Sequence, residues 1–230
     1  MKIPRTIHQI WGDNKNPEPP QIFLEMTETW KTHHPEWNFL LWKHNDINEF
    51  LREYYPDFID TFLSYKYNIQ RWDMLRYLIL CHSGGVYIDH DCECLEPIDG
   101  LLGENLCCLG LEPDRHCELM GLDLYVGNAF MATIPNHHFF NQLIKQLPLI
   151  KSDSRDKLNF VLETTGPLML TRFYQNYTPK EEVFLIPSKY IAPLDLYETR
   201  TLFNNKKNKM VEQKIQEAYC IHYFFGSWTK

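Results

Sequence analysis

The chain has 230 residues, of which 44% are hydrophobic and 14% aromatic, and it carries a net charge of −7. This length and apolar content predict a single domain with a substantial core. The acidic balance argues against nucleic acid as a partner, because no broad basic face is available to neutralise phosphates.

Seven cysteines, an odd number without a CxxC pair, predict reduced and mostly buried thiols in a cytosolic protein. A zinc cluster built from Cys92, Cys94 and nearby histidines is a weaker alternative. The first residues lack the apolar core and cleavage site of a signal peptide, and no run of about 18 apolar residues occurs. We therefore expect a cytoplasmic protein with at most peripheral contact with the inner face of a membrane.

Strands and helices are predicted to alternate through the first half of the chain. The predicted elements are, in chain order, a strand at 6–11, a helix at 21–32, a strand at 38–42, a helix capped by Asn45 or Asp46 and running to Tyr54, one or two helices at 57–82, strands at 86–89, 105–111 and 124–133, a helix capped by Asn136 and running to Leu147, two helical pieces at 155–174 broken at Gly166 and Pro167, and strands at 183–187 and 219–224. This order predicts an α/β fold with one mostly parallel central sheet and flanking helices.

The stretch GGVYIDHDCECLEPID, residues 84–99, places an acidic cluster where the strand at 86–89 ends. In parallel sheets, ligands bind beyond the carboxyl ends of strands. Residues two apart in an extended segment point the same way, so Asp89 and Asp91 can share one ligand while His90 turns away. Two close carboxylates repel each other unless a cation lies between them, and oxygen ligands suit Mg²⁺ or Mn²⁺ with a diphosphate.

Other interpretations of this stretch have to be weighed. An ordinary turn with solvated aspartates fits Asp-x-Asp alone, and an aspartyl phosphotransferase also uses Asp-x-Asp after a strand. A calcium loop is excluded, because the sixth position from Asp89 is Cys94 instead of glycine and the twelfth is Gly100 instead of glutamate.

A second charged pair precedes this cluster in RWDMLRYLIL, where Asp73 and Arg76 lie three residues apart on a predicted helix. Such a pair shares one helix face. It is either a surface or half-buried ion pair, or a functional pair in which Asp73 binds sugar hydroxyls and Arg76 offers a cation to a phosphate.

Six stretches together resemble the family 32 glycosyltransferases, whose sugar-binding region contains a DXD motif. They are IPRTIHQIWG, HPEWNFLLW, RWDMLRYLILCHSGGVYIDHDCECLEPID, GNAFMATIPNHHFF, ETTGPLML and IHYFFGSW. The family includes bacterial capsule enzymes and eukaryotic Golgi mannosyltransferases, and the large glucosylating bacterial toxins share the same core pattern. The third stretch is the most specific, because its aspartate–arginine pair, double glycine and Asp-x-Asp have the family's order and spacing.

The resemblance implies one GT-A domain over residues 1–230, with a nucleotide-sugar half at 1–110 and an acceptor half with a metal- and diphosphate-binding tail at 111–230. It implies a sugar-nucleotide donor, a bound Mn²⁺ or Mg²⁺, and retention of anomeric configuration. By the resemblance, Asp73, Arg76, Asp89 and Asp91 are the catalytic set. Asp89, Asp91 and His222 are the metal ligands, and the donor-binding residues are His8, Trp11, Asp73, Arg76, Asp89, Asn128, Ser227 and Trp228.

Several of these residues also have a structural interpretation. Trp11 can be core packing, His222 a satisfied buried histidine, Asn128 a turn cap, and Ser227 with Trp228 a docked tail.

The expected function is a metal-dependent retaining glycosyltransferase that uses a UDP-sugar in preference to GDP-mannose. We expect its acceptor to be a glycan or a lipid-linked oligosaccharide in surface polysaccharide synthesis. The alternatives are a metal-dependent phosphatase using Asp89 and a non-catalytic module that binds a sugar nucleotide or glycan. The polar stretch NNKKNK, residues 204–209, is either a solvated loop or a contact to anionic lipid.

Overall fold

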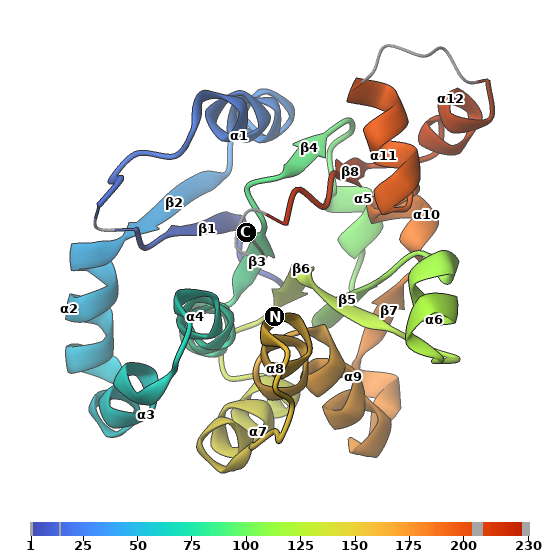
Figure 1. The fold of residues 1–230 in the computed structure, drawn as a ribbon. Coiled ribbons are helices and arrows are strands. Elements are labelled where there is room, and N and C mark those ends of the chain that lie inside the picture. Colours follow the sequence, from blue (N-terminus) through green and yellow to red (C-terminus); the bar gives the residue numbers. More distant parts are fainter. Residues whose placement is uncertain (1, 14, 204–208, 227–230) are drawn as a thin grey trace.

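A six-stranded mixed sheet forms the centre of the molecule in the computed structural model, which describes residues 2–13, 15–203 and 209–226. Across the sheet the strands are β2 (Asn38–Lys43), β1 (Thr6–Trp11), β3 (Gly85–Ile88), β6 (Val126–Thr133), β5 (Cys107–Leu111) and β7 (Phe184–Ile186). β6 is antiparallel to β3 and β5, whereas the other pairs are parallel. The predicted α/β fold with a mostly parallel central sheet is therefore confirmed (Figure 1).

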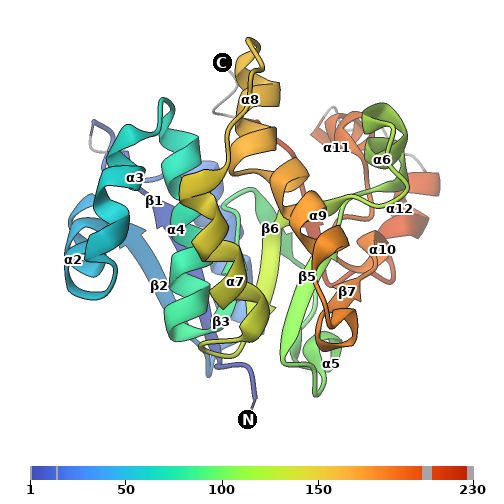
Figure 2. The ribbon, with the colours of Figure 1, turned by 90° about the horizontal axis from the view of Figure 1, so that it is seen from below.

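Helices cover one face of this sheet, as Figure 2 shows with α4 and α7 in front. They are α2 (His44–Tyr54), α4 (Asn68–Ser83), α7 (His138–Gln146) and α9 (Pro167–Asn176), with α3 (Ile59–Ser64) and α8 (Lys157–Thr164) beside them. The other face carries α1 (Gln21–His33), α5 (Asp99–Leu102), α10 (Ser188–Ile191) and a two-stranded sheet of β4 (Cys92–Cys94) and β8 (Cys220–His222).

The pleat of β3 separates the two layers of core. Tyr87 belongs to the apolar cluster under α4 and α7, whereas Val86 and Ile88 belong to the cluster that contains Trp30 of α1. Successive side chains of a strand point to opposite faces, so a strand buried on both faces is apolar at every position. β3 therefore holds the residues that follow it, starting with Asp89, at the centre of the molecule.

Gly84 ends α4 and lets the chain turn back into β3. Its φ is 63°, and a Cβ there would lie 2.6 Å from the Pro135 ring and 2.7 Å from the Thr133 carbonyl oxygen. A side chain is therefore disfavoured both by the backbone and by space. This explains in physical terms why the predicted helix stops at the double glycine.

Two predicted helix caps are wrong in detail. The cap of α7 is His137, whose ring accepts from the Phe139 amide, while Asn136 precedes it at a φ of 56°. α2 begins after Lys43, and the Asp46 carboxylate accepts from the Lys43 amide instead of acting as the cap residue itself. Neither Lys43 nor His137 is a residue type favoured at an N-cap, so the local sequence pointed to the stronger capping residues nearby.

The second half contains short elements that the sequence pattern did not predict, including α6 (Asp114–Met120), α11 (Leu196–Phe203) and α12 (Lys209–Ile215). Three 3₁₀ turns complete the fold, at Pro56–Phe58, Leu147–Leu149 and Lys180–Glu182. Of the polar stretch at 204–209, residues 204–208 are not among the residues that the structure describes.

All seven cysteines are free thiols, and all but Cys117 are buried, as expected. Within the described ranges, no helix combines the length and the apolar composition needed to cross a membrane.

Candidate active site

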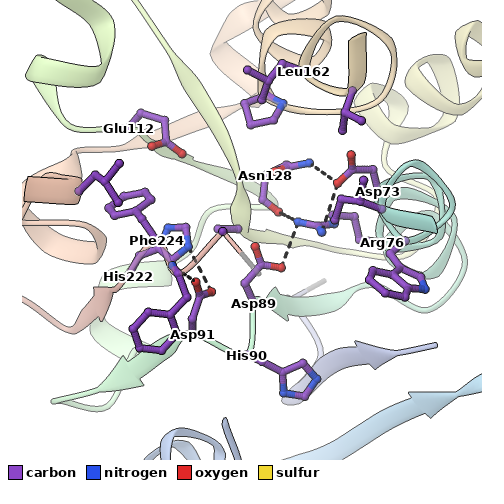
Figure 3. Close-up of a pocket in the computed structure, with 18 of the residues that line it drawn as sticks. Asp73, Arg76, Asp89, His90, Asp91, Glu112, Asn128, Leu162, His222 and Phe224 are labelled. Atoms are coloured by element: carbon purple, nitrogen blue, oxygen red, sulfur yellow. Dashed lines mark hydrogen bonds and ion pairs between the residues drawn. The ribbon is translucent and has the colours of Figure 1, made fainter. Parts of the chain in front are cut away.

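A cavity of ≈ 490 Å³ opens where β1 and β3 end, at the place predicted for a ligand. It gathers residues that are far apart in the sequence. Its polar lining comprises Trp11, Asp73, Arg76, Tyr87, Asp89, His90, Asp91, Glu112, His116, Tyr125, Asn128, Arg200 and His222. Figure 3 shows the carboxylates of Asp89 and Asp91 turned into the cavity, with the His90 ring turned away from them.

One side of the cavity is a buried network of Asp73, Arg76, Asn128 and Thr165. Asp73 Oδ1 accepts from Asn128 Nδ2 at 2.9 Å and lies 3.2 Å from Arg76 Nη2, while Asp73 Oδ2 accepts from the Thr165 hydroxyl at 2.9 Å. Arg76 Nη1 donates to the backbone oxygen of Asn128 at 2.7 Å. The side chains of Asp73 and Arg76 are each 4% exposed. The buried network therefore holds its members in place before any ligand arrives.

Burial and charge act against each other in this network. Burial raises the pKa of Asp73 to about 6, although Arg76 and the hydrogen bonds from Thr165 and Asn128 lower it. Burial alone would lower the pKa of Arg76, but Asp89, Tyr87 and Asp73 together raise it. The guanidinium thus stays charged, and its Nε has no hydrogen-bond partner among the described residues. A buried donor left unpaired is rare in a folded protein and marks this part of the network as incompletely satisfied.

Asp89 joins the buried network to the rest of the cavity. Its Oδ1 lies 3.1 Å from Arg76 Nη1 and accepts from the Tyr87 hydroxyl at 2.7 Å. The Arg76 guanidinium also lies over the Tyr87 ring, 4.5 Å from its centroid. The Asp89 side chain is 26% exposed, far more than Arg76, so it is more accessible than Arg76 to a ligand in the cavity. Burial, with the nearby Asp91 charge, raises the pKa of Asp89 against the effect of Arg76.

The Asp91–His222 pair lies on the other side of Asp89 and comes from the small β4–β8 sheet. His222 Nε2 is 3.3 Å from Asp91 Oδ1, and the Phe225 amide donates to Asp91 Oδ2 at 2.8 Å. β4 pairs Cys92 with His222 in antiparallel register, which brings the chain's last described strand beside the acidic cluster. The pair therefore depends on contacts between residues about 130 positions apart.

The Asp91 carboxylate and the His222 ring stabilise each other's charge. Burial would lower the pKa of His222, but the Asp91 carboxylate raises it to about 9. Burial would likewise raise the pKa of Asp91, but His222 and the Phe225 amide hold it below its usual value. At neutral pH the pair is an imidazolium bound to a carboxylate.

The ligand atoms near Asp91 fit a divalent cation in part. Asp91, Cys92 and His222 each offer an atom within 4.8 Å of the others, which no other group of this kind does in the described part of the chain. Burial raises the pKa of the Cys92 thiol well above its usual range, so Cys92 does not supply a thiolate. The remaining set is a carboxylate and an imidazole, with Asp89 beyond them; it lacks the thiolates of a structural zinc cluster, and its carboxylates fit Mn²⁺ or Mg²⁺.

The other residues predicted for the site have different positions. Trp11 lines the cavity, donates its indole N–H to the Asn16 carbonyl oxygen and lies edge-on to His90, 5.7 Å between centroids. His8 is fully buried away from the cavity, with Nδ1 accepting from Trp42 and Nε2 donating to the Gly84 carbonyl oxygen. Both ring nitrogens of His8 are thus occupied, and the structure does not bring it to the donor site. Ser227 and Trp228 lie outside the described residues.

Several residues in or directly behind the cavity were missed by the sequence reasoning. Tyr87 holds Asp89, Thr165 holds Asp73, and Glu112 with His116 forms a second carboxylate–histidine pair on the cavity wall. Glu112 precedes α6, the helix that contains His116, so helical spacing gave no signal for this pair. Nothing in the sequence linked Thr165 to Asp73.

Comparison with known proteins gives a consistent result. Residues 20–107 match a family described as "Glycosyltransferase sugar-binding region containing DXD motif". Inositol phosphoceramide mannosyltransferase 1 of Schizosaccharomyces pombe is 36% identical over 193 residues, which are 81% of this chain and 56% of that relative. Uncharacterized glycosyltransferase L373 of Acanthamoeba polyphaga mimivirus is 27% identical over 231 residues, 99% of this chain and 84% of the viral protein.

Among solved structures, the PaToxG glycosyltransferase superposes with a TM-score of 0.56 at 16% identity, covering 94% of this chain and 85% of that one. This likeness shows the predicted GT-A fold. The chain spans about half the length of the first curated relatives that it matches.

Proposed function

This chain belongs to the glycosyltransferases whose sugar-binding region contains a DXD motif, and from that premise we propose that it transfers a sugar from a nucleotide-diphosphate donor to a hydroxyl group of a glycan or glycolipid. The observation that carries the proposal is the junction at Asp89. There a buried aspartate–arginine network meets a carboxylate–histidine pair in one cavity at the end of β3.

The buried network provides the donor-sugar side of the cavity. Arg76 lines the cavity and is fixed by Asp73, Asp89 and the Asn128 carbonyl oxygen, so its guanidinium can attract a sugar or phosphate oxygen with little loss of side-chain freedom. Asn128 and Asp73 would contact sugar hydroxyls from the same side. Trp11 would stack on the base at the other end of the cavity.

The Asp91–His222 pair provides the diphosphate side. Asp91 and His222 would hold Mn²⁺ or Mg²⁺ with Asp89, and the bound cation would neutralise the departing diphosphate. Asp91 has to exchange His222 for the cation, and His222 has to lose its proton before it can act as a ligand. For the proposed retention of configuration, Arg76 stabilises the leaving group on the side that the acceptor approaches.

The transferred sugar and the acceptor follow from names of relatives alone. Those relatives include mannosyltransferases named for inositol phosphoceramide, so we propose mannose and a lipid acceptor as the first pair to test. This differs from the UDP-sugar that the sequence favoured, and a role in surface polysaccharide synthesis stays a prediction. The compartment in which the protein acts also stays a prediction.

Thermal unfolding with UDP or GDP, each with and without Mn²⁺, tests the donor site. A ligand at 100 times its dissociation constant stabilises the folded state by about 2.7 kcal/mol, so a metal-dependent shift with one nucleotide is expected. Donor cleavage is then measured with UDP-glucose, UDP-galactose and GDP-mannose. No shift with either nucleotide and no cleavage of any donor would contradict the proposal.

The same assays separate the alternatives. A phosphatase using Asp89 would release phosphate from a simple phosphoester such as p-nitrophenyl phosphate without a nucleotide. A binding module would show the thermal shift without turnover of any donor. The ion pair with Arg76 and the hydrogen bond from Tyr87 hold the Asp89 carboxylate in place and favour a binding role over that of a free nucleophile.

A further inference from the structure

Glu112 is a cavity carboxylate that the donor chemistry above does not use. It follows β5 directly and precedes α6, and its side chain is 10% exposed. Figure 3 shows its carboxylate directed into the cavity, across from Asp73 and Arg76 and on the side of His222. A partly desolvated carboxylate is stabilised when a partner donates a hydrogen bond to it.

His116 fixes the orientation of Glu112. Its Nδ1 lies 2.9 Å from Glu112 Oε2, and its Nε2 lies 3.3 Å from the Leu196 backbone nitrogen. A backbone N–H can only donate, so Nε2 accepts and the hydrogen of the neutral ring belongs on Nδ1. His116 therefore donates to Glu112 Oε2. The Phe224 ring packs edge-on against His116, 4.7 Å between centroids, and limits its movement.

The other carboxylate oxygen, Oε1, remains available to a ligand. A Cβ at Gly127 would lie 2.5 Å from Oε1, so this oxygen occupies the space that a side chain at position 127 would fill. Gly127 directly precedes Asn128, a member of the buried network. Oε1 thus lies beside the backbone of β6, next to Asn128, and no hydrogen-bond donor of the described residues contacts it.

The charge of Glu112 decides which part of a substrate it can meet. A carboxylate without a cation beside it repels a diphosphate, so the leaving group is expected at the Asp91–His222 pair and not at Glu112. A neutral hydroxyl of a sugar or polyol donates a hydrogen bond and is accepted at low cost. Tyr125, Leu196 and Phe224 line the cavity around Glu112 and offer apolar surface to the face of such a ring.

We propose that Glu112 Oε1 binds and orients the attacking hydroxyl of a neutral sugar or polyol ring in the acceptor, with His116 as its positioning residue. This inference rests on the proposed glycosyl transfer. In the step, the bond from the anomeric carbon to the diphosphate oxygen breaks with its electron pair. The acceptor oxygen bonds to that carbon, and its proton passes to the departing diphosphate. Glu112 aligns the hydroxyl and does not have to take the proton.

Glu112→Gln is the decisive variant, because His116 still donates to the amide oxygen while an N–H₂ group now faces the cavity. The hydrogen bond to the acceptor is then reversed. We expect the rate of transfer from GDP-mannose to inositol phosphoceramide in detergent micelles to fall by about 10- to 100-fold. Cleavage of the same donor by water should fall similarly, since water takes the place of the attacking hydroxyl. The affinity for nucleotide and Mn²⁺ should change by about twofold or less.

Glu118→Gln is the matched control, because Glu118 is exposed on α6, the helix that contains His116, and does not line the cavity. It should behave as wild type in all assays. His116→Ala should lose activity as Glu112→Gln does, whereas His116→Gln, whose amide can still donate to Glu112, should restore part of it.

Unchanged transfer and cleavage in Glu112→Gln would overturn the proposal, as would an equal loss of nucleotide and metal affinity, which would place Glu112 on the donor side. A wild-type protein that neither binds nucleotide with Mn²⁺ nor cleaves any donor would refute the proposed function itself, and this inference would fall with it.

Discussion

The buried network and the Asp91–His222 pair meet at Asp89, yet they are built in different ways. In the buried network, the Asp73 carboxylate pairs with Arg76 and accepts hydrogen bonds from Asn128 and Thr165, while Arg76 donates to the Asn128 backbone oxygen. The side chains of Asp73 and Arg76 are each 4% exposed. The Asp91–His222 pair is 14% and 12% exposed and lies on a two-stranded sheet near the last described residues. The first arrangement is fixed before a ligand binds, whereas the second can exchange its partners for a ligand.

This difference separates two costs of substitution. A charge removed from the buried network leaves an opposite charge in the core that no solvent reaches, so folding suffers. A charge removed from the Asp91–His222 pair leaves an imidazole that can release its proton, so folding is largely spared and ligand binding suffers. The predictions below test this division from the largest expected effect to the smallest.

Arg76→Met should produce the largest effect, a loss of about 3–5 kcal/mol in the free energy of unfolding. The methionine fills the space but leaves Asp73 and Asp89 without their cation, and the pKa of Asp73 is already raised to about 6 by burial. Chemical denaturation at pH 7 measures the loss. Donor cleavage should also disappear.

The double variant Asp73→Asn with Arg76→Met is the control for this interpretation. It removes both charges, and it should be more stable than Arg76→Met alone. If Arg76→Met alone lost less than about 1 kcal/mol in the free energy of unfolding, the buried network would not be a fixed part of the fold.

Asp91→Asn should leave folding almost intact and reduce the affinity for nucleotide with Mn²⁺ by about 100-fold. Without the Asp91 charge, the pKa of His222 should fall from about 9 towards its usual value, so no unpaired charge remains in the core at pH 7.5. The asparagine oxygen can still accept from the Phe225 amide. Denaturation and nucleotide titration are performed on the same preparation.

An Asp91→Asn protein that binds nucleotide and Mn²⁺ as wild type does would remove Asp91 from the metal site. A large loss of stability would instead place it with the buried network. Asp123→Asn is a suitable control, because Asp123 is an exposed aspartate that does not line the cavity.

His8 extends the comparison away from the cavity, because it is a buried polar group that serves the scaffold alone. Burial lowers its pKa to about 4 despite the hydrogen bond to the Gly84 carbonyl oxygen. The unfolded chain then binds more protons than the folded chain between pH 6.5 and 4, so stability falls as the pH drops through this range. The contribution lost between pH 7 and pH 5 is about 2 kcal/mol.

Denaturation curves of wild type and His8→Gln at pH 7 and pH 5 isolate the contribution of His8 to the pH dependence of stability. The variant should be less stable than wild type at both pH values. Between pH 7 and pH 5, however, its free energy of unfolding should fall by about 2 kcal/mol less than that of wild type. An equal loss in both proteins would show that His8 is not held neutral in the folded state.

The sequence predicts the fold best where local pattern and burial agree. The strand at 6–11, the helix at 21–32 and the break between α8 and α9 follow from periodicity and from glycine and proline, and they appear in the structure. The short helices α6 and α11 do not have enough turns for a clear period. At the start of α7 the favoured capping residue Asn136 is passed over, and His137, which is not a favoured type, is the cap.

Residues close along the chain could be grouped from the sequence, whereas partners joined only by the fold came from the family resemblance, as His222 and Asn128 did, or were missed, as Thr165 was. Asp89 and Asp91 both point into the cavity, although residues 90 and 91 form a turn closed by the Cys92 amide on the Asp89 carbonyl oxygen and not the expected extended segment. His8 was expected at the donor, but Gly84 and Trp42 occupy its ring nitrogens, and strand pairing brings them there. Glu112 lies in a proline-containing turn without periodic pattern, and its approach to Gly127 depends on β5 and β6 being neighbours.

Thr165→Val should give the smallest effect and test the division most finely. Thr165 lies between α8 and α9, is fully buried, and donates its hydroxyl to Asp73 Oδ2. Valine has nearly the same shape, so the variant loses one charge-assisted hydrogen bond and little packing. Arg76 and Asn128 still hold the other oxygen, and we expect a loss of about 1.5 kcal/mol in the free energy of unfolding. Thr165→Ser keeps the hydroxyl and should lose less. Because Thr165 does not line the cavity, nucleotide affinity with Mn²⁺ should stay within about twofold of wild type. If instead affinity fell while stability held, the hydrogen bond from Thr165 to Asp73 would serve ligand binding and not folding, and the distinction between a fixed side and an exchangeable side of the cavity would be wrong.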